Sequence, residues 1–185
     1  MIIERHIPAQ SLQPFIKEYI IIESDENRIN RVLPDTSLAI AFRFKGQLNH
    51  LNNDESIQLP GIVVSGLRKT PRLINYTANT GNIIAIFKDG AASFFFKEPV
   101  HHLFEDSVSL ENLIPKQTVA DTREQLAESN NSNHRIEILN RFFHSIFTEQ
   151  KEDKLVNLAL QKIRVANGNR SEEHTSELQS QNRIS

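Results

Sequence analysis

The chain has 185 residues, no cysteine, and a formal net charge of −2 at pH 7. The missing cysteine excludes disulfides and thiolate chemistry, and the near-neutral charge gives no general field for holding nucleic acid. The first ten residues lack a signal-peptide pattern, and apolar runs such as 20–22 and 94–96 are too short to span a bilayer. We therefore expect a cytoplasmic protein with no membrane partner.

Up to about residue 115, short β-branched or aromatic runs alternate with turn residues, a pattern typical of strands. A short helix or helical turn is expected at Leu12 to Glu18. The expected strands are 19–23, 31–33, 38–44, 62–64, 72–77 and 82–87. Their regular spacing favours an antiparallel barrel or sandwich. Ala91 to Phe96 is compatible with either a short helix or a strand, and we expect at least one of its three phenylalanines to pack into a barrel mouth.

The later part of the chain has helical periodicity. Thr118 is the expected N-cap of a helix that ends near Glu128, and a second helix is expected at about 134–149. The second helix carries a broad apolar stripe, which indicates burial on more than one side. Its members are Ile136, Ile138, Leu139, Phe142, Phe143, Ile146 and Phe147. A last helix is expected from Asp153, as N-cap, to Gly168. The fold class is therefore α+β, with strands followed by helices.

The sequence predicts no catalytic residue, no metal ligand and no cofactor. His101 and His102 are adjacent, and neighbouring side chains on a strand point to opposite faces, so this pair is a poor chelate. Arg68, Lys69 and Arg72 form a basic cluster near a proline. We interpret this cluster as a solvated hairpin end, with an anion site as the alternative.

Residues 170–185 resemble the translation of a short-read sequencing adapter. The match runs without interruption from Arg170 to Ser180 and resumes at Ile184, after a gap of the length of a sample index. We expect this segment to be adapter-derived, so that the natural sequence stops being visible at about Asn169 and its continuation is missing, and we exclude the tail from fold reasoning.

Several short motifs, in order, resemble the N-terminal half of AraC-type transcriptional regulators. Thr36 stands where the family's "LPDG" turn has glycine, and Asp89 stands where its "F+PGAA..FF" segment has proline. The matching segments are 12–19, 32–35, 65–71, 84–96, 109–113 and 135–147. The resemblance spans residues 1–169.

The resemblance implies a domain organisation in which a cupin-like, β-rich ligand-sensing domain occupies residues 1–115. A helical linker or dimerisation segment would follow at 116–150, and the first helix of a truncated helix-turn-helix domain at 151–169. This fragment would sense a small-molecule effector, form a homodimer, and reach DNA only through the missing C-terminal domain. It would carry no DNA-binding residues itself.

We interpret five phenylalanines as ordinary barrel core, and as candidates for the effector pocket in the alternative. They are Phe42, Phe44, Phe87, Phe94 and Phe96. Two other classes of function stay open, a small cupin-like metal-dependent enzyme and a stand-alone interaction domain. Convergent His and carboxylate ligands would favour the enzyme, and a filled barrel without a cavity would favour the interaction domain.

Overall fold

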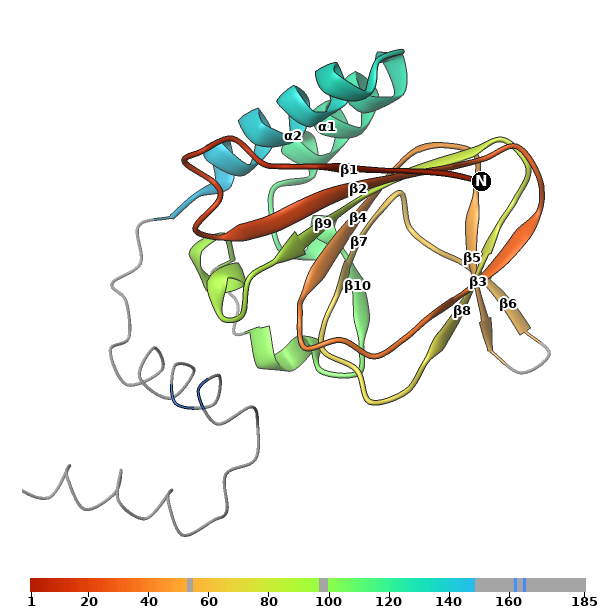
Figure 1. Ribbon diagram of the computed structural model, residues 1–185, viewed down its shortest axis with the longest axis horizontal. Helices are drawn as coiled ribbons and strands as arrows, with labels where there is room; N and C mark the ends of the chain where they lie inside the picture. The colour runs from red at the N-terminus through yellow and green to blue at the C-terminus, as the bar shows by residue number, and fades with distance from the viewer. Residues whose placement is uncertain (53–54, 97–99, 149–161, 163–164, 166–185) are drawn as a thin grey trace, which may run out of the picture. The chain divides into compact units, whose positions relative to one another are not determined.

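The computed structural model describes residues 1–52, 55–96, 100–148, 162 and 165 (Figure 1). The chain divides into two units, 1–150 and 151–185, and both sheets and both α-helices belong to the first. The expected helix at 153–168 lies outside the described residues except for Lys162 and Val165, which are helical. The adapter-like tail at 170–185 also lies outside them.

The larger of two antiparallel sheets has six strands in the order β1-β2-β9-β4-β7-β10 (Figure 1). Their bounds are β1 Ile2–His6, β2 Ile16–Ser24, β9 Thr80–Phe87, β4 Ala39–Lys45, β7 Ile62–Ser65 and β10 Ser107–Ser109. The long central strands pair in register, with Ile21 opposite Ile83 and Phe42 also opposite Ile83. β-branched and aromatic side chains suit this pleated, two-sided surface.

The smaller sheet has four strands in the order β3-β8-β5-β6. Their bounds are β3 Arg28–Val32, β8 Arg72–Tyr76, β5 Leu48–Asn52 and β6 Glu55–Gln58. Its edge strands are polar and largely exposed, whereas β8 alternates buried and more exposed positions along its length. That alternation shows that one face of this sheet is covered.

Two helices follow the strands, α1 at Lys116–Glu128 and α2 at Ser132–Ile146. Thr118 is not the N-cap of α1, because the helix begins two residues earlier, after Pro115, whose fixed φ suits a helix start. Asn131 caps α2 by accepting a hydrogen bond from Asn133 N at 2.8 Å. Three short 3₁₀ helices, 91–94, 100–103 and 110–112, link the strands to the helices.

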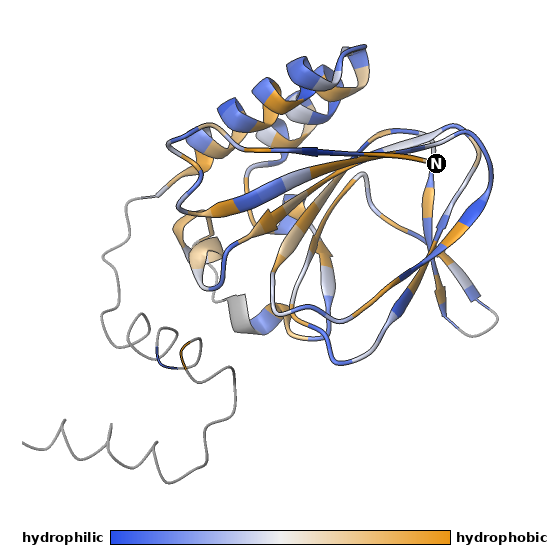
Figure 2. Ribbon diagram, in the orientation of Figure 1, coloured by the Kyte–Doolittle hydropathy of each residue, from blue (hydrophilic) through white to orange (hydrophobic). Residues whose placement is uncertain are grey.

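An aromatic core lies between α2 and the larger sheet. Phe143 is 0% exposed, and its ring contacts those of Tyr19, Phe42 and Phe87 at 5.7–6.1 Å between centroids. Both helices and several strands mix apolar and polar residues, which lets each bury one side only (Figure 2). Truncating a phenylalanine in such a position costs about 3–5 kcal/mol. The broad stripe expected on α2 is confirmed, since Ile136, Ile138, Leu139, Phe142 and Phe143 are all buried.

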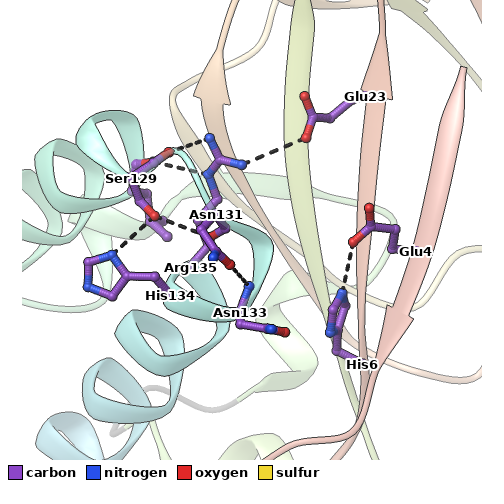
Figure 3. Close-up of polar contacts among 9 residues, drawn as sticks. Glu4, His6, Glu23, Ser129, Asn131, Asn133, His134 and Arg135 are labelled. Carbon is purple, nitrogen blue, oxygen red and sulfur yellow. Dashed lines mark hydrogen bonds and ion pairs between the residues drawn. The ribbon is translucent and has the colours of Figure 1, made fainter.

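Arg135 fastens the helix pair to the sheet (Figure 3). Its guanidinium donates to the carbonyl oxygens of Leu126 and Ser129 at the end of α1, and Nη1 lies 3.7 Å from a carboxylate oxygen of Glu23 on β2. The guanidinium also lies 3.8 Å from the centroid of the Phe44 ring. The side chain is buried, so these contacts satisfy a charge that would otherwise be costly to desolvate.

The predicted fold class is confirmed: antiparallel sheets are followed by helices in an α+β arrangement. The six expected strands are present with shifted ends. Within the described part of the chain, no helix has the length and hydropathy needed to cross a membrane.

Candidate functional site

A cavity of about 380 Å³ lies between the two sheets. Its apolar wall on the larger sheet includes Ile20 and Ile22 of β2 and Ile84 and Ile86 of β9, and Ile74 of β8 lines it from the smaller sheet. Side chains two residues apart on a strand share a face, so each of these strands contributes alternate residues to the wall. The size falls within the range of small-molecule sites.

Two arginines meet at one end of this cavity. Arg72 on β8 is 9% exposed, and Arg68 in the preceding loop is half-buried. Arg72 Nη1 and Arg68 Nη2 each donate to the hydroxyl oxygen of Ser107 at 2.7 Å, and Ser65 Oγ lies 2.9 Å from the same oxygen. One buried and one half-buried guanidinium therefore share a single neutral hydroxyl as an acceptor.

Gly66 lets the segment that carries Ser107 come this close. A Cβ at Gly66 would lie 1.8 Å from the carbonyl oxygen of Leu103, which no side chain tolerates. The two backbones are joined there by Gly66 N to Asp106 O at 3.2 Å and by Glu105 N to Leu67 O at 2.8 Å. This close backbone approach places β10, and thus Ser107, beside the arginines.

Neither arginine has a carboxylate partner among the described residues, in contrast to Arg5 at another part of the wall. Arg5 Nη1 lies 2.6 Å from Glu18 Oε2. Near the arginine pair, Asp106 Oδ1 accepts from Ser107 N at 2.7 Å, and a Glu105 carboxylate oxygen accepts from Lys69 N. These two acids bond to backbone amides rather than to a guanidinium.

The pair remains short of acceptors. The Nε atoms of both Arg68 and Arg72 are buried and have no hydrogen-bond partner. Burial, followed by repulsion from Arg68, lowers the pKa of Arg72 to about 10, although Asp106 opposes the effect. Burial also lowers the pKa of Arg68. Because buried polar groups normally find partners, unused donors that share a cavity indicate a place for an acceptor.

Neutral polar groups occupy the opposite end of the cavity. Tyr76 lies four residues after Arg72 on β8, which is about 13 Å along the strand. Asn82 on β9 lines the same end, since its side chain hydrogen-bonds with Tyr76, and its Oδ1 is buried without a partner. Burial raises the pKa of Tyr76, so its hydroxyl stays protonated. The cavity therefore has a cationic end, apolar walls and a neutral polar end.

The five candidate phenylalanines do not line this cavity. Phe42, Phe87 and Phe96 are buried in the helix-facing core, and Phe94 packs against the rings of Phe15 and Phe147. Phe44 lies under Arg135 and borders a separate pocket of about 470 Å³ beside α1. Phe95 and Phe96 pack in the same helix-facing core, not in the mouth of the cavity between the sheets.

The basic cluster, in contrast, is not a solvated hairpin end. Lys69 is exposed, but Arg72 is buried and Arg68 half-buried, which fits the anion-site interpretation. His102 lies in a 3₁₀ helix rather than on a strand, so the strand argument about the histidine pair does not apply. The described residues contain no group of three or more His, Cys, Asp or Glu side chains placed to hold a metal ion.

The fold and cavity define a two-sheet antiparallel domain with an attached helix pair. Residues 4–109 match the family described as "Domain of unknown function (DUF6597)", and the chain belongs to this family. No curated protein matches the chain.

Solved structures also match, among them the vicilin from Solanum melongena, at 16% identity over 80% of this chain and a TM-score of 0.28. The chain spans 39% of that vicilin chain, which is described as having different anionic ligands in structurally similar pockets. At this TM-score the similarity assigns neither a fold nor a ligand to this chain.

Proposed function

We propose that this domain senses a small-molecule effector and belongs to an AraC-type transcriptional regulator. The observation that carries the proposal is that the cavity and the helix pair lie on opposite faces of the same central strands. An effector bound between the sheets contacts one face of these strands. The helices α1 and α2 pack on the other face and would respond to binding. Binding would favour one arrangement of the helices over another.

Strand β2 makes the connection through alternate residues. Ile20 and Ile22 line the cavity, whereas Tyr19 and Glu23 face the helices. The Tyr19 hydroxyl donates to Asn140 Oδ1 of α2 at 3.2 Å, and Glu23 is the partner of Arg135. Because cores are close-packed, a shift of β2 on the cavity side displaces the contacts with α2.

The regulator assignment is supported by the order of the AraC-like segments from 12–19 to 135–147. In this proposal the helices also mediate a homodimer, and DNA is bound outside residues 1–150. A stand-alone interaction domain would need no internal cavity. A metal-dependent enzyme would need convergent ligands, whereas the polar groups at the cationic end are guanidinium donors and hydroxyls. We therefore favour a sensor without enzymatic activity or a cofactor.

A neutral fluorescent probe tests the cavity independently of any charge. N-phenyl-1-naphthylamine should bind the full chain and slow amide hydrogen exchange in α1 and α2. Ala41→Phe, which places a large ring in the cavity wall, should weaken probe binding by about tenfold or more. Ala78→Phe, at an exposed turn, is the matched control and should bind the probe as the native chain does. The proposal would be overturned if Ala41→Phe bound the probe as tightly as the native chain. It would also be overturned if the probe left amide hydrogen exchange in α1 and α2 unchanged.

A further inference from the structure

We propose that the cavity binds a monocarboxylic acid with an apolar body, whose carboxylate lies on Arg68 and Arg72. This inference rests on the proposed sensing function and names the chemical class of the effector. It follows from three features of the cavity: unused guanidinium donors, positive charge that no ion pair neutralises among the described residues, and the distribution of polar groups along its length.

Both arginines that line the cavity keep unused donors. Both hydrogen bonds from Arg72 to described residues leave from Nη1, so Nε and Nη2 remain. These two nitrogens form the parallel fork that carboxylates accept in a bidentate manner. Arg68 adds an unpaired Nε beside it, while its Nη atoms donate to Glu105 O at 3.1 Å and to Ser107 Oγ at 2.7 Å.

The positive charge of the arginine pair also favours a carboxylate as the ligand group. Two guanidinium groups share one hydroxyl, and neither lies within ion-pair distance of a carboxylate among the described residues. The charges of Glu105 and Asp106 offset part of the positive charge, but both carboxylates are bonded to backbone amides. Asp35, an acid in the cavity lining, is exposed to solvent. A bound anion would offset the repulsion between Arg68 and Arg72 in surroundings where charges are weakly screened.

The rest of the cavity selects an apolar body with one charge. Isoleucines from β2, β8 and β9 line the span of about 13 Å between Arg72 and Tyr76. The far end offers Tyr76 and Asn82, which are neutral, so a second anionic group has no cationic partner there. At the rim, the exposed apolar residues Ile3, Val32 and Leu33 provide a surface over which an apolar chain can enter.

Calorimetric titration of the full chain tests the assignment with a homologous series of hexanoate, octanoate, decanoate and dodecanoate. Affinity should rise along the series and stop rising once the cavity is filled. Decanol keeps the body and removes the charge, and it should bind about tenfold or more weakly than decanoate. Decyl phosphate tests the other common anionic head, and tighter binding of it than of decanoate would overturn the carboxylate assignment.

Variants locate the head group. Arg72→Met and Arg68→Gln should each weaken decanoate binding about tenfold to a hundredfold and leave decanol binding unchanged. Lys69→Met removes a charge from the same loop outside the cavity lining and should bind decanoate as the native chain does. Thermal unfolding confirms that each variant is folded.

Two negative results are distinguishable. If N-phenyl-1-naphthylamine and decanol bind and respond to Ala41→Phe, but decanoate gains nothing from the arginines, the carboxylate inference fails and the sensing proposal stands. If none of these probes binds, both fail.

Discussion

Arg68 and Arg72, four residues apart in sequence, donate hydrogen bonds to one acceptor, the hydroxyl oxygen of Ser107, at 2.7 Å each. Two like charges are held together inside the fold without a carboxylate between them. Such an arrangement is unfavourable in the empty protein, because burial and mutual repulsion both penalise the charged forms. In the proposed sensor, a bound anion would relieve this repulsion and so favour the ligand-bound state of the domain.

Removing the shared acceptor should destabilise the protein, and removing one of the charges should not. Ser107→Ala leaves two buried guanidinium donors without their acceptor and should lower the free energy of unfolding by about 1–3 kcal/mol. Arg72→Met fills similar space without a charge and should leave that free energy unchanged or raise it by about 1 kcal/mol. Urea denaturation measures both, with the exposed Ser56→Ala as control. A large loss of stability in Arg72→Met would mean that Arg72 stabilises the fold in the absence of a ligand.

The pKa of His50 reports the charge at the cationic end. Burial, followed by the charges of Arg72 and Arg68, lowers this pKa below 6.5. Arg72→Met should therefore raise the pKa of His50 toward 6.5, though not fully, since the burial remains. Decanoate should move it in the same direction. Proton NMR of the imidazole as a function of pH measures the shift, and Lys69→Met should leave the titration unchanged.

The same shift has a defined effect on stability. The folded chain holds the His50 proton less tightly than the unfolded chain, so the unfolded state takes up this proton first as pH falls below 6.5. His50 therefore costs no stability above that pH and reduces stability as pH falls toward its folded pKa. The reduction should be smaller in Arg72→Met.

Sequence patterns predicted the hydrophobic strands better than the polar ones. The strands β2, β4 and β9 carry β-branched and aromatic runs that indicate a buried sheet. These three strands were expected close to their observed bounds. The strands β1, β5, β6 and β10 were not expected. Their residues are largely polar or exposed, and they pair because neighbouring strands offer an edge rather than because of their own pattern.

The burial of Arg72 was not predicted, because it depends on contacts that are distant in the sequence. In the sequence, Arg68 and Arg72 stand near a proline among polar residues, which is typical of a solvated turn. Their burial depends on Ser107, which lies 35 and 39 residues further along, and on the close approach at Gly66. Sequence periodicity carries no information on such long-range contacts. The phenylalanines, conversely, are apolar enough to suggest a pocket, but they fill the core under the helices.

Arg135 should be essential for holding the helix pair on the sheet. Arg135→Met leaves the carbonyls of Leu126 and Ser129 without their donor, removes the contact with the Phe44 ring, and frees Glu23. The free energy of unfolding should fall by about 2–4 kcal/mol. Arg141→Met, on an exposed face of the same helix, should change it by less than about 0.5 kcal/mol. Equal effects of the two substitutions would show that the contacts of Arg135 contribute nothing to the free energy of unfolding.

If the domain is a sensor, loss of the Arg135 contacts should also reduce the effect of ligand binding in the cavity on the helices. Arg135→Met should still bind N-phenyl-1-naphthylamine, because Arg135 does not line the cavity. The slowing of amide exchange in α1 and α2 on probe binding should be reduced or lost. Full retention of that response would mean that coupling runs through other contacts, such as Tyr19 with Asn140.

The regulator proposal is tested most directly at the level of the gene. Because residues 170–180 resemble a translated sequencing adapter, we predict that amplification and sequencing of source DNA across codon 169 will not return this segment. The reading frame should instead continue into basic, helical sequence with two helix-turn-helix units, because an AraC-type sensor acts through such a domain. If RSEEHTSELQS is encoded in the source DNA and followed by a stop codon, the regulator assignment falls. The cavity and its arginine pair would then belong to a stand-alone binding domain. The titrations with decanoate and decanol would still test whether the cavity binds a carboxylate.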